Sequence, residues 1–250
     1  MSRESTSRWI SGGRISQNPR VRLFCFPYSG ASASIYYTWI NYAPTMVDIC
    51  PIQLPGHGTR LTELLHNDLQ SLIKDAYIEL EPYFSDVPYV FFGHSFGALF
   101  SFELARVLRD QGKNSPEHLF VSGHGAPHLV DLYPRIHTLP EKEFRERIGE
   151  LNGMSPEILK NNELMELLSP IIRADFSCCE TYSYCPGIPF SFPITAFGGL
   201  EDKHVSRNDL EQWKIHSTVA TDVRLFPGDH FFLHGNVENI VRVILRVSLQ

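Results

Sequence analysis

The sequence predicts an α/β fold in which a mostly parallel sheet has helices on both faces and an inserted helical lid. Short, continuously apolar runs alternate with segments of helical periodicity, and this alternation is typical of strands buried on both sides. The chain has 250 residues, of which 43% are hydrophobic, enough for the core of one large domain. Between residues 139 and 184 the alternation stops, and helix-like pieces follow one another over a stretch too long for an ordinary crossover.

The composition limits the classes of protein to which the chain can belong. Its net charge of −6 and the lack of a basic run argue against a nucleic-acid binder. Residues 1–18 lack the apolar core of a signal peptide, so we expect a flexible N-terminal tail before a domain at 19–250. No apolar stretch is long enough to span a bilayer, and none of the five cysteines has Cys-x-x-Cys spacing. We therefore expect a cytoplasmic protein with reduced thiols and no membrane partner.

In the first half of the chain, apolar runs that end at Pro or Gly predict strands, and apolar residues at a 3.6-residue spacing predict helices. Asn67 or Asp68 can cap the longest of these helices, and Ser32 or Ser34 can cap the first. Strands are expected at 21–26, 47–52 and 89–92, and helices from about 34, at 67–84 and at 96–108.

In the second half, the same signals predict strands at 118–122, 192–197 and 222–226, and helices at 207–217 and 236–247. The inserted lid, at about 139–184, is expected to hold helices at 141–151, 156–161 and 164–182. Its apolar residues are more numerous than one amphipathic helix needs. They could pack only against one another and the sheet, or some of them could line an acyl tunnel. The two interpretations are compatible with each other.

The turn Gly93-His94-Ser95-Phe96-Gly97 follows an apolar run and precedes a helical period. At such a strand-to-helix turn the middle residue is strained and exposes its side chain. Glycines two residues away on either side remove the Cβ atoms that would clash. Ser95 is therefore the candidate nucleophile, with a buried turn serine as the alternative. The backbone N–H of Phe96 would point at the group that Ser95 attacks.

Acyl transfer by a serine needs a base to take its proton and a carboxylate to orient that base. In this strand–helix arrangement the order along the chain is Ser, acid, His. His230 follows the last predicted strand in a Gly-containing turn, so it is the candidate base. Asp202, in the loop after the penultimate strand, is the candidate acid, and Asp131 is the alternative. Asp229 is adjacent to His230 and cannot easily turn back to the same imidazole.

Two other histidine motifs point less clearly to chemistry. His124 and His128 have the spacing of helical metal ligands, but the Gly and Pro residues around them argue against a helix. No third ligand lies nearby in the sequence, so no metal site is predicted. His57 lies in a loop rich in Pro and Gly and is interpreted as a loop histidine rather than a base.

A set of short motifs extends from about residue 20 to the end of the chain. They are Phe26-Pro27-Tyr28-Ser29-Gly30, Gly93-His94-Ser95-Phe96-Gly97, Ser122-Gly123, Ala126-Pro127-His128, Arg173-Ala174-Asp175, Glu180-x-Tyr182, Gly199-x-x-Asp202, Trp213 and Pro227-Gly228-Asp229-His230-Phe231-Phe232. Together these motifs resemble those of type II thioesterases, the stand-alone editing hydrolases of polyketide and nonribosomal peptide assembly lines. The resemblance implies the α/β-hydrolase fold.

The resemblance also implies a site and a reaction. It assigns Ser95, Asp202 and His230 to a catalytic triad and the backbone N–H groups of Ser29 and Phe96 to the oxyanion hole. The implied reaction is hydrolysis of acyl thioesters on the phosphopantetheine arm of acyl or peptidyl carrier proteins, which removes stalled or aberrant acyl groups. The enzyme itself would need no metal and no cofactor, because the phosphopantetheine belongs to the carrier.

Two departures from the family pattern leave the substrate preference open. The chain has Gly30-Ala31 where the family usually has two glycines, and His57-Gly58 come between Leu54-Pro55-Gly56 and Arg60 where the family usually has Arg at once. Both changes could alter the mouth of the pocket.

The implied partner is a carrier protein, and carriers of this kind are usually acidic. Docking on a chain that is itself acidic would need a local basic patch. The lid offers Arg145, Arg147, Lys160 and Arg173 as candidates, with a solvated helix face as the alternative for each. The chain is expected to act as a monomer. The alternative functions are a medium-chain fatty acyl-carrier-protein hydrolase, another serine carboxylesterase, or an inactive acyl- or carrier-binding protein.

Overall fold

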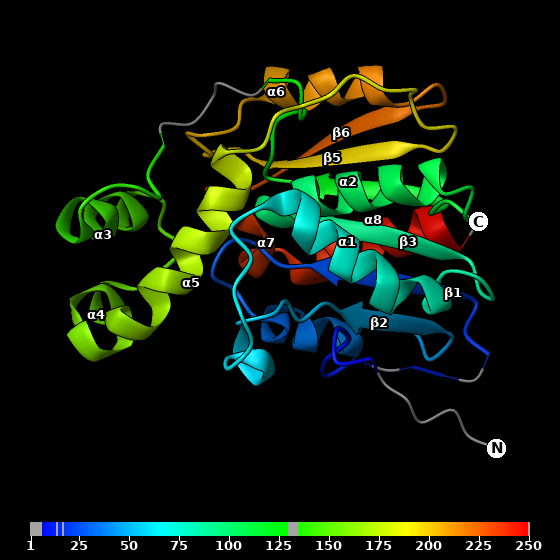
Figure 1. The fold of residues 1–250 in the computed structure, drawn as a ribbon. Coiled ribbons are helices and arrows are strands. Elements are labelled where there is room, and N and C mark those ends of the chain that lie inside the picture. Colours follow the sequence, from blue (N-terminus) through cyan, green and yellow to red (C-terminus); the bar gives the residue numbers. More distant parts are fainter. Residues whose placement is uncertain (1–6, 14, 17, 130–134, 250) are drawn as a thin grey trace.

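The computed structural model describes residues 7–249 apart from 14, 17 and 130–134. Its centre is a six-stranded sheet with the strand order β2-β1-β3-β4-β5-β6, in which all neighbouring strands are parallel (Figure 1). This arrangement confirms the predicted α/β class. The strands are β1 (Val21–Phe26), β2 (Val47–Pro51), β3 (Tyr89–His94), β4 (His118–Ser122), β5 (Ile194–Gly199) and β6 (Thr221–Phe226).

Side chains that alternate along each strand divide the core between the two faces of the sheet. On β1, Phe24 and Phe26 join the core shared with α1 and α2, whereas Leu23 and Cys25 join the core shared with η1 and α8. Outside the lid, the main helices are η1 (Ala33–Tyr42), α1 (Leu69–Leu80), α2 (Phe96–Asp110), α6 (Arg207–Glu211), η4 (Gln212–His216), α7 (Phe232–Gly235) and α8 (Val237–Ser248). Within the described part of the chain, no helix is both long enough and apolar enough to traverse a bilayer.

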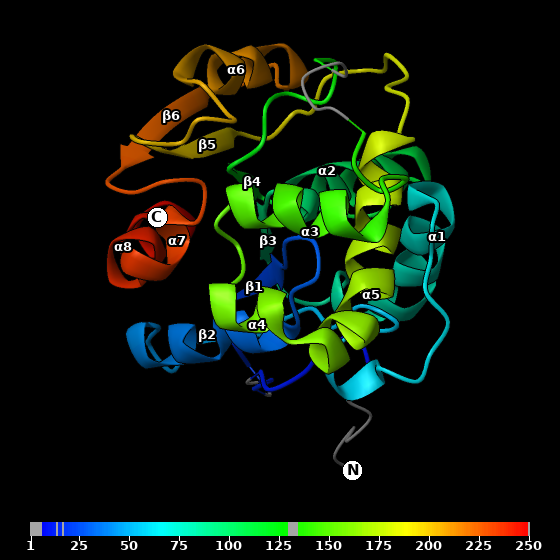
Figure 2. The same ribbon diagram turned by 90° about the vertical axis from the view of Figure 1, so that its left-hand side faces the viewer.

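An insertion between β4 and β5 holds α3 (Glu141–Glu150), α4 (Pro156–Lys160) and α5 (Asn162–Glu180), which match the helices predicted there. We call the segment 139–184 the lid. In Figures 1 and 2, α3 and α4 stand away from the sheet, and α5 runs back toward α1 and α2. The lid has a small core of its own, made of Ile136, just before the segment, and Phe144, Ile148 and Ile172 within it.

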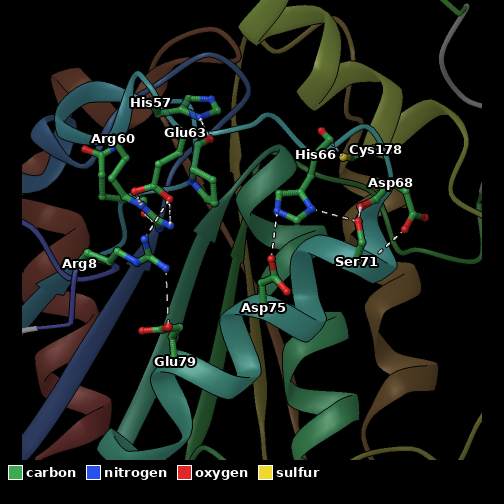
Figure 3. Close-up of polar contacts among 12 residues, drawn as sticks. Arg8, His57, Arg60, Glu63, His66, Asp68, Ser71, Asp75, Glu79 and Cys178 are labelled. Atoms are coloured by element: carbon green, nitrogen blue, oxygen red, sulfur yellow. Dashed lines mark hydrogen bonds and ion pairs between the residues drawn. The ribbon is translucent and has the colours of Figure 1, made fainter.

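Residues 7–13 pack against the domain, which corrects the expectation that all of 1–18 forms a flexible tail. Trp9 is only 1% exposed, and the guanidinium of Arg60 lies 4.6 Å from the centre of its ring. Arg8 forms ion pairs with two glutamates on the neighbouring loop and α1 (Figure 3). A single tryptophan in a polar segment gives no periodic signal, yet its large apolar surface is strongly driven to a core.

Candidate active site

Ser95 lies at the turn between β3 and α2, with backbone angles of φ 52° and ψ −116° that non-glycine residues rarely adopt. The two flanking glycines make this turn possible. A Cβ on Gly93 would lie 2.0 Å from the carbonyl oxygen of Gly97, and a Cβ on Gly97 would lie 2.1 Å from that of Phe26. The N–H of Ser95 donates to the carbonyl of Ser122 at 2.7 Å, which ties the turn to β4. The strand–turn–helix context predicted for Ser95 is therefore present.

His230 and Asp202 are joined by a hydrogen bond of 2.9 Å between Nδ1 and Oδ2. The other carboxylate oxygen of Asp202 accepts the backbone N–H groups of His204 and Val205, at 2.8 and 3.2 Å. Burial alone would raise the pKa of Asp202, but the hydrogen bond from His230 and those from the two amides outweigh it and lower that pKa. The ionised carboxylate therefore fixes the imidazole with Nδ1 as a donor, which leaves Nε2 to accept a proton.

Ser95 and His230 both line one cavity of about 480 Å³. Parallel strands end at one rim of a sheet, so the loops that follow them converge there. Five lining residues illustrate this convergence, since each lies at or after the end of a different strand: Ser29, Ser95, His124, His204 and His230.

The lid forms the opposite wall of this cavity. Leu151 and Phe176 line it, so some apolar residues of the lid face the cavity in addition to packing against one another. Arg147 and Glu150 also line it and form an ion pair at 2.6 Å. Lys160 is exposed at the end of α4.

The backbone amides predicted for an oxyanion hole belong to residues that line the cavity. Phe96 is the first residue of α2, and Ser29 lies in a turn that the N–H of Ala31 closes by donating to the carbonyl of Tyr28 at 3.0 Å. Gly30 has φ +77°, as the third position of a type II turn requires. The turn and the start of α2 therefore lie beside the same space as Ser95.

The other histidines near the cavity differ from His230 in their surroundings. Burial lowers the pKa of His94 well below its usual value and that of His124 to about 4, which makes both poor bases at neutral pH. His128 is hydrogen-bonded to His216, with 3.0 Å between their ring nitrogens. In the part of the chain that the structure describes, no three His, Cys, Asp or Glu side chains are grouped so that they could hold a metal ion.

Of the two competing acids, Asp229 is bound to groups other than His230. The carboxylate of Asp229 accepts the N–H of Phe231 at 2.9 Å and the side-chain amide of Asn152 at 3.3 Å. Both of its oxygens thus have partners other than the imidazole. Asp131 lies outside the described residues.

Two of the basic residues proposed for docking are bound within the lid. Arg145 pairs with Glu141 at 2.7 Å, and Arg173 pairs with the same carboxylate at 3.1 Å. The guanidinium of Arg173 also lies 3.8 Å from the ring centre of Phe144. Arg173 is therefore held within the structure of the lid by an ion pair and a ring contact.

Sequence reasoning interpreted His57 as a loop histidine and found no partner for it. In the structure, its Nε2 lies 2.9 Å from a carboxylate oxygen of Asp175 on α5. Asp175 belongs to the Arg173-Ala174-Asp175 motif, but no local pattern connects two residues 118 positions apart.

A family model for the thioesterase domain matches residues 21–247. The gramicidin S biosynthesis protein GrsT of Aneurinibacillus migulanus is 40% identical over 240 residues, which are 96% of this chain and 93% of GrsT. The linear gramicidin dehydrogenase LgrE of Brevibacillus parabrevis is also 40% identical, over 96% of this chain and 92% of its own. The crystal structure of ClbQ from the colibactin NRPS/PKS pathway matches with a TM-score of 0.87 at 31% identity, covering 92% of this chain and 97% of ClbQ. The parallel sheet, the strained serine turn and these matches lead to one conclusion: the chain belongs to the thioesterase family.

Proposed function

We propose that this chain is a cytoplasmic type II thioesterase that removes stalled or aberrant acyl groups from carrier proteins in nonribosomal peptide or polyketide biosynthesis. The observation that carries the proposal is that Ser95 and His230 line the same cavity, with Asp202 hydrogen-bonded to His230 at 2.9 Å. Membership of the thioesterase family supports the reaction class. Relatives named for gramicidin S and colibactin production support the class of pathway.

In the proposed reaction Ser95 is the nucleophile and His230 the general base. Because Nδ1 of His230 donates to Asp202, Nε2 takes the proton of Ser95. The serine oxygen bonds to the thioester carbonyl carbon, the C–S bond breaks, and the pantetheine sulfur leaves and takes the proton from Nε2. A thiol pKa of about 8.5 means that this leaving group needs little acid assistance. The neutral imidazole of His230 then takes a proton from water, whose oxygen bonds to the acyl carbon. The bond to the serine oxygen breaks, and Nε2 gives the proton to that oxygen, which restores Ser95.

The N–H groups of Ser29 and Phe96 are the proposed donors to the oxyanion. Each such donor contributes on the order of 3 kcal/mol to the transition state. The mechanism involves no metal or redox cofactor of the enzyme, since phosphopantetheine arrives on the carrier.

The name of LgrE describes a dehydrogenase, which would transfer hydride rather than cleave a thioester. A nicotinamide cofactor is commonly held by a Gly-x-Gly-x-x-Gly turn between a strand and a helix. The corresponding loop after β1 contains Gly30 as its one glycine, and the printed sequence has no Gly-x-Gly-x-x-Gly at any position. The loop after β1 therefore favours thioester hydrolysis over hydride transfer.

The test uses an octanoyl carrier thioester and the octanoyl ester of p-nitrophenol. The wild-type chain is expected to favour the thioester, and Ser95→Ala should lower its hydrolysis by about 10⁴-fold or more. A preference for the oxygen ester would instead support a carboxylesterase. A fluorophosphonate should label the wild-type chain at Ser95, and failure to label a folded chain would support an inactive binding protein.

A further inference from the structure

A second histidine–carboxylate pair lies beside the proposed active site, between the loop after β2 and the lid. His57 and Asp175 are each 3% exposed, and Nε2 of His57 lies 2.9 Å from Oδ2 of Asp175. The other ring nitrogen, Nδ1, lies 2.8 Å from the carbonyl oxygen of Pro55. The mechanism proposed above does not use either side chain.

The partners of His57 define its protonation state. A carbonyl oxygen and a carboxylate oxygen only accept hydrogen bonds, so both ring nitrogens must donate, which an imidazolium alone can do. Burial by itself would lower the pKa of His57, but the charge and hydrogen bond of Asp175 and the carbonyl of Pro55 outweigh it and raise that pKa. The pair is therefore a buried ion pair.

The same carboxylate holds the turn that follows β1. Oδ2 of Asp175 also accepts the backbone N–H of Gly30 at 2.7 Å. One turn earlier on α5, Ile172 is so close to this loop that a Cβ on Gly30 would lie 2.7 Å from its Cγ1. One turn later, Cys179 lines the cavity together with Ser29. Positions 172, 175 and 179 share one face of a helix, so this face of α5 packs along the turn.

We propose that His57 and Asp175 are positioning residues, in which the charged pair fixes the Gly30 amide and thereby the neighbouring Ser29 N–H that stabilises the oxyanion. The inference rests on the proposed function, because it concerns the oxyanion donor of that reaction. His57 orients the carboxylate, the carboxylate orients the Gly30 peptide, and the turn carries Ser29 to the cavity. Neither side chain contacts the reacting atoms.

Because the pair is charged, the position of the turn that contains Ser29 and Gly30 should also depend on pH. The charged groups near His57 are Asp175 on α5 and Arg60 on its own loop. Cys178 and Cys179, near the carboxylate on α5, stay neutral, because burial raises the pKa of Cys178 to about 12 and that of Cys179 well above its usual value. A raised histidine pKa stabilises the folded arrangement at low pH and loses that contribution as pH rises through the folded-state pKa. Activity should therefore fall on the alkaline side.

The experiment compares His57→Gln, His57→Arg and wild type over pH 6 to 10 with an octanoyl carrier thioester, scoring kcat and KM separately. His57→Gln should lower kcat about 10- to 100-fold with little change in KM, because an oxyanion donor acts in the transition state. His57→Arg keeps the charge, so it should recover most of kcat and lose the alkaline decline. An unchanged kcat in His57→Gln, or an alkaline decline retained in an active His57→Arg, overturns the proposal.

His66 provides a matched control on the same connection between β2 and α1. Its imidazole also pairs with an aspartate, Asp75 at 3.2 Å, and with the hydroxyl of Ser71, and both partners lie on α1 (Figure 3). The contact of His66 with α5 is through its backbone carbonyl, which accepts from the thiol of Cys178 at 3.4 Å and is kept when the side chain is replaced. His66→Gln should leave kcat and the pH profile unchanged, and a decline equal to that of His57→Gln would also overturn the proposal. If His57→Gln does not fold, the proposal is tested by the pH profile of His57→Arg, which should lack the alkaline decline of the wild type.

Labelling of Ser95 by a fluorophosphonate separates this inference from the proposed function. Unlabelled Ser95 in the wild type, or full activity in Ser95→Ala, rejects the triad itself. Normal dependence on Ser95 with an unchanged His57→Gln rejects only the role of the His57–Asp175 pair.

Discussion

The two walls of the cavity are held in different ways. The sheet wall rests on two large apolar cores, in which residues such as Phe24 and Phe92 are fully buried. The outer part of the lid has only a small apolar core, although Cys178 and Tyr182 at its end join the core shared with α1 and α2, and polar pairs also tie the lid down. Glu180 accepts hydrogen bonds from the backbone of Ile136 and from His137, and Asp175 pairs with His57.

The contacts that hold the two walls differ in how they depend on pH. Burial of apolar surface, worth about 25 cal/mol per Å², does not titrate. One contact that holds the lid does titrate, the pair of His57 and Asp175. The sheet wall therefore rests on apolar contacts, whereas the lid depends in part on a contact whose strength changes with pH.

The largest expected effect among the following variants lies on the sheet wall, at Asp202. Asp202→Asn should lower kcat by about 10³- to 10⁴-fold, because the amide favours the tautomer of His230 in which Nε2 already carries a proton. Asp229→Asn is the control, since its oxygen can still accept the N–H of Phe231, and its kcat should stay within about threefold. Steady-state kinetics on the carrier thioester measures both. Equal losses in the two variants would contradict the assignment of Asp202 as the acid.

A smaller effect, with a different signature, is expected from the core of the lid. Phe144→Ala should lower the free energy of unfolding by about 3 kcal/mol, since Phe144 is fully buried. Hydrolysis of an octanoyl thioester should fall more than that of an acetyl thioester, because the lid lines only the substrate side of the cavity.

Phe120→Ala in β4 is the matched control for the lid variant, because Phe120 is equally buried but belongs to the sheet. Denaturant unfolding should give a similar loss of stability, with both thioesters affected alike. If Phe144→Ala also affected both substrates alike, the two walls would not have separate roles.

The smallest effect is expected on the surface of the lid. Lys160→Glu at the exposed end of α4 should lower kcat/KM for an acyl carrier by about three- to tenfold, with a strong dependence on salt, if an acidic carrier docks there. Because Lys160 is not among the residues that line the cavity, a small-molecule thioester should be hydrolysed at the wild-type rate. The control is Arg242→Glu, which reverses an exposed basic residue on α8 and should change the hydrolysis of neither substrate. If Lys160→Glu lowered the hydrolysis of both substrates equally, docking at this site would be contradicted.

The sequence alone was sufficient for features that depend on neighbouring residues. Buried parallel strands require continuous apolar runs, and the turn at Ser95 requires glycines at 93 and 97, so both are visible in short windows. His230 and Asp202 could be selected because each follows a predicted strand, and strand ends meet at one rim. The helices of the lid were visible for the same reason.

Only the tertiary structure decided the contacts between distant segments. It placed Trp9 against Arg60 and Arg173 against Phe144, and it joined His57 to Asp175 on a distant helix. Periodicity reports which face of an element is buried, but it does not report what that face meets. A buried imidazolium and a carboxylate attract each other wherever the chain brings them together, and that meeting depends on how the whole fold closes.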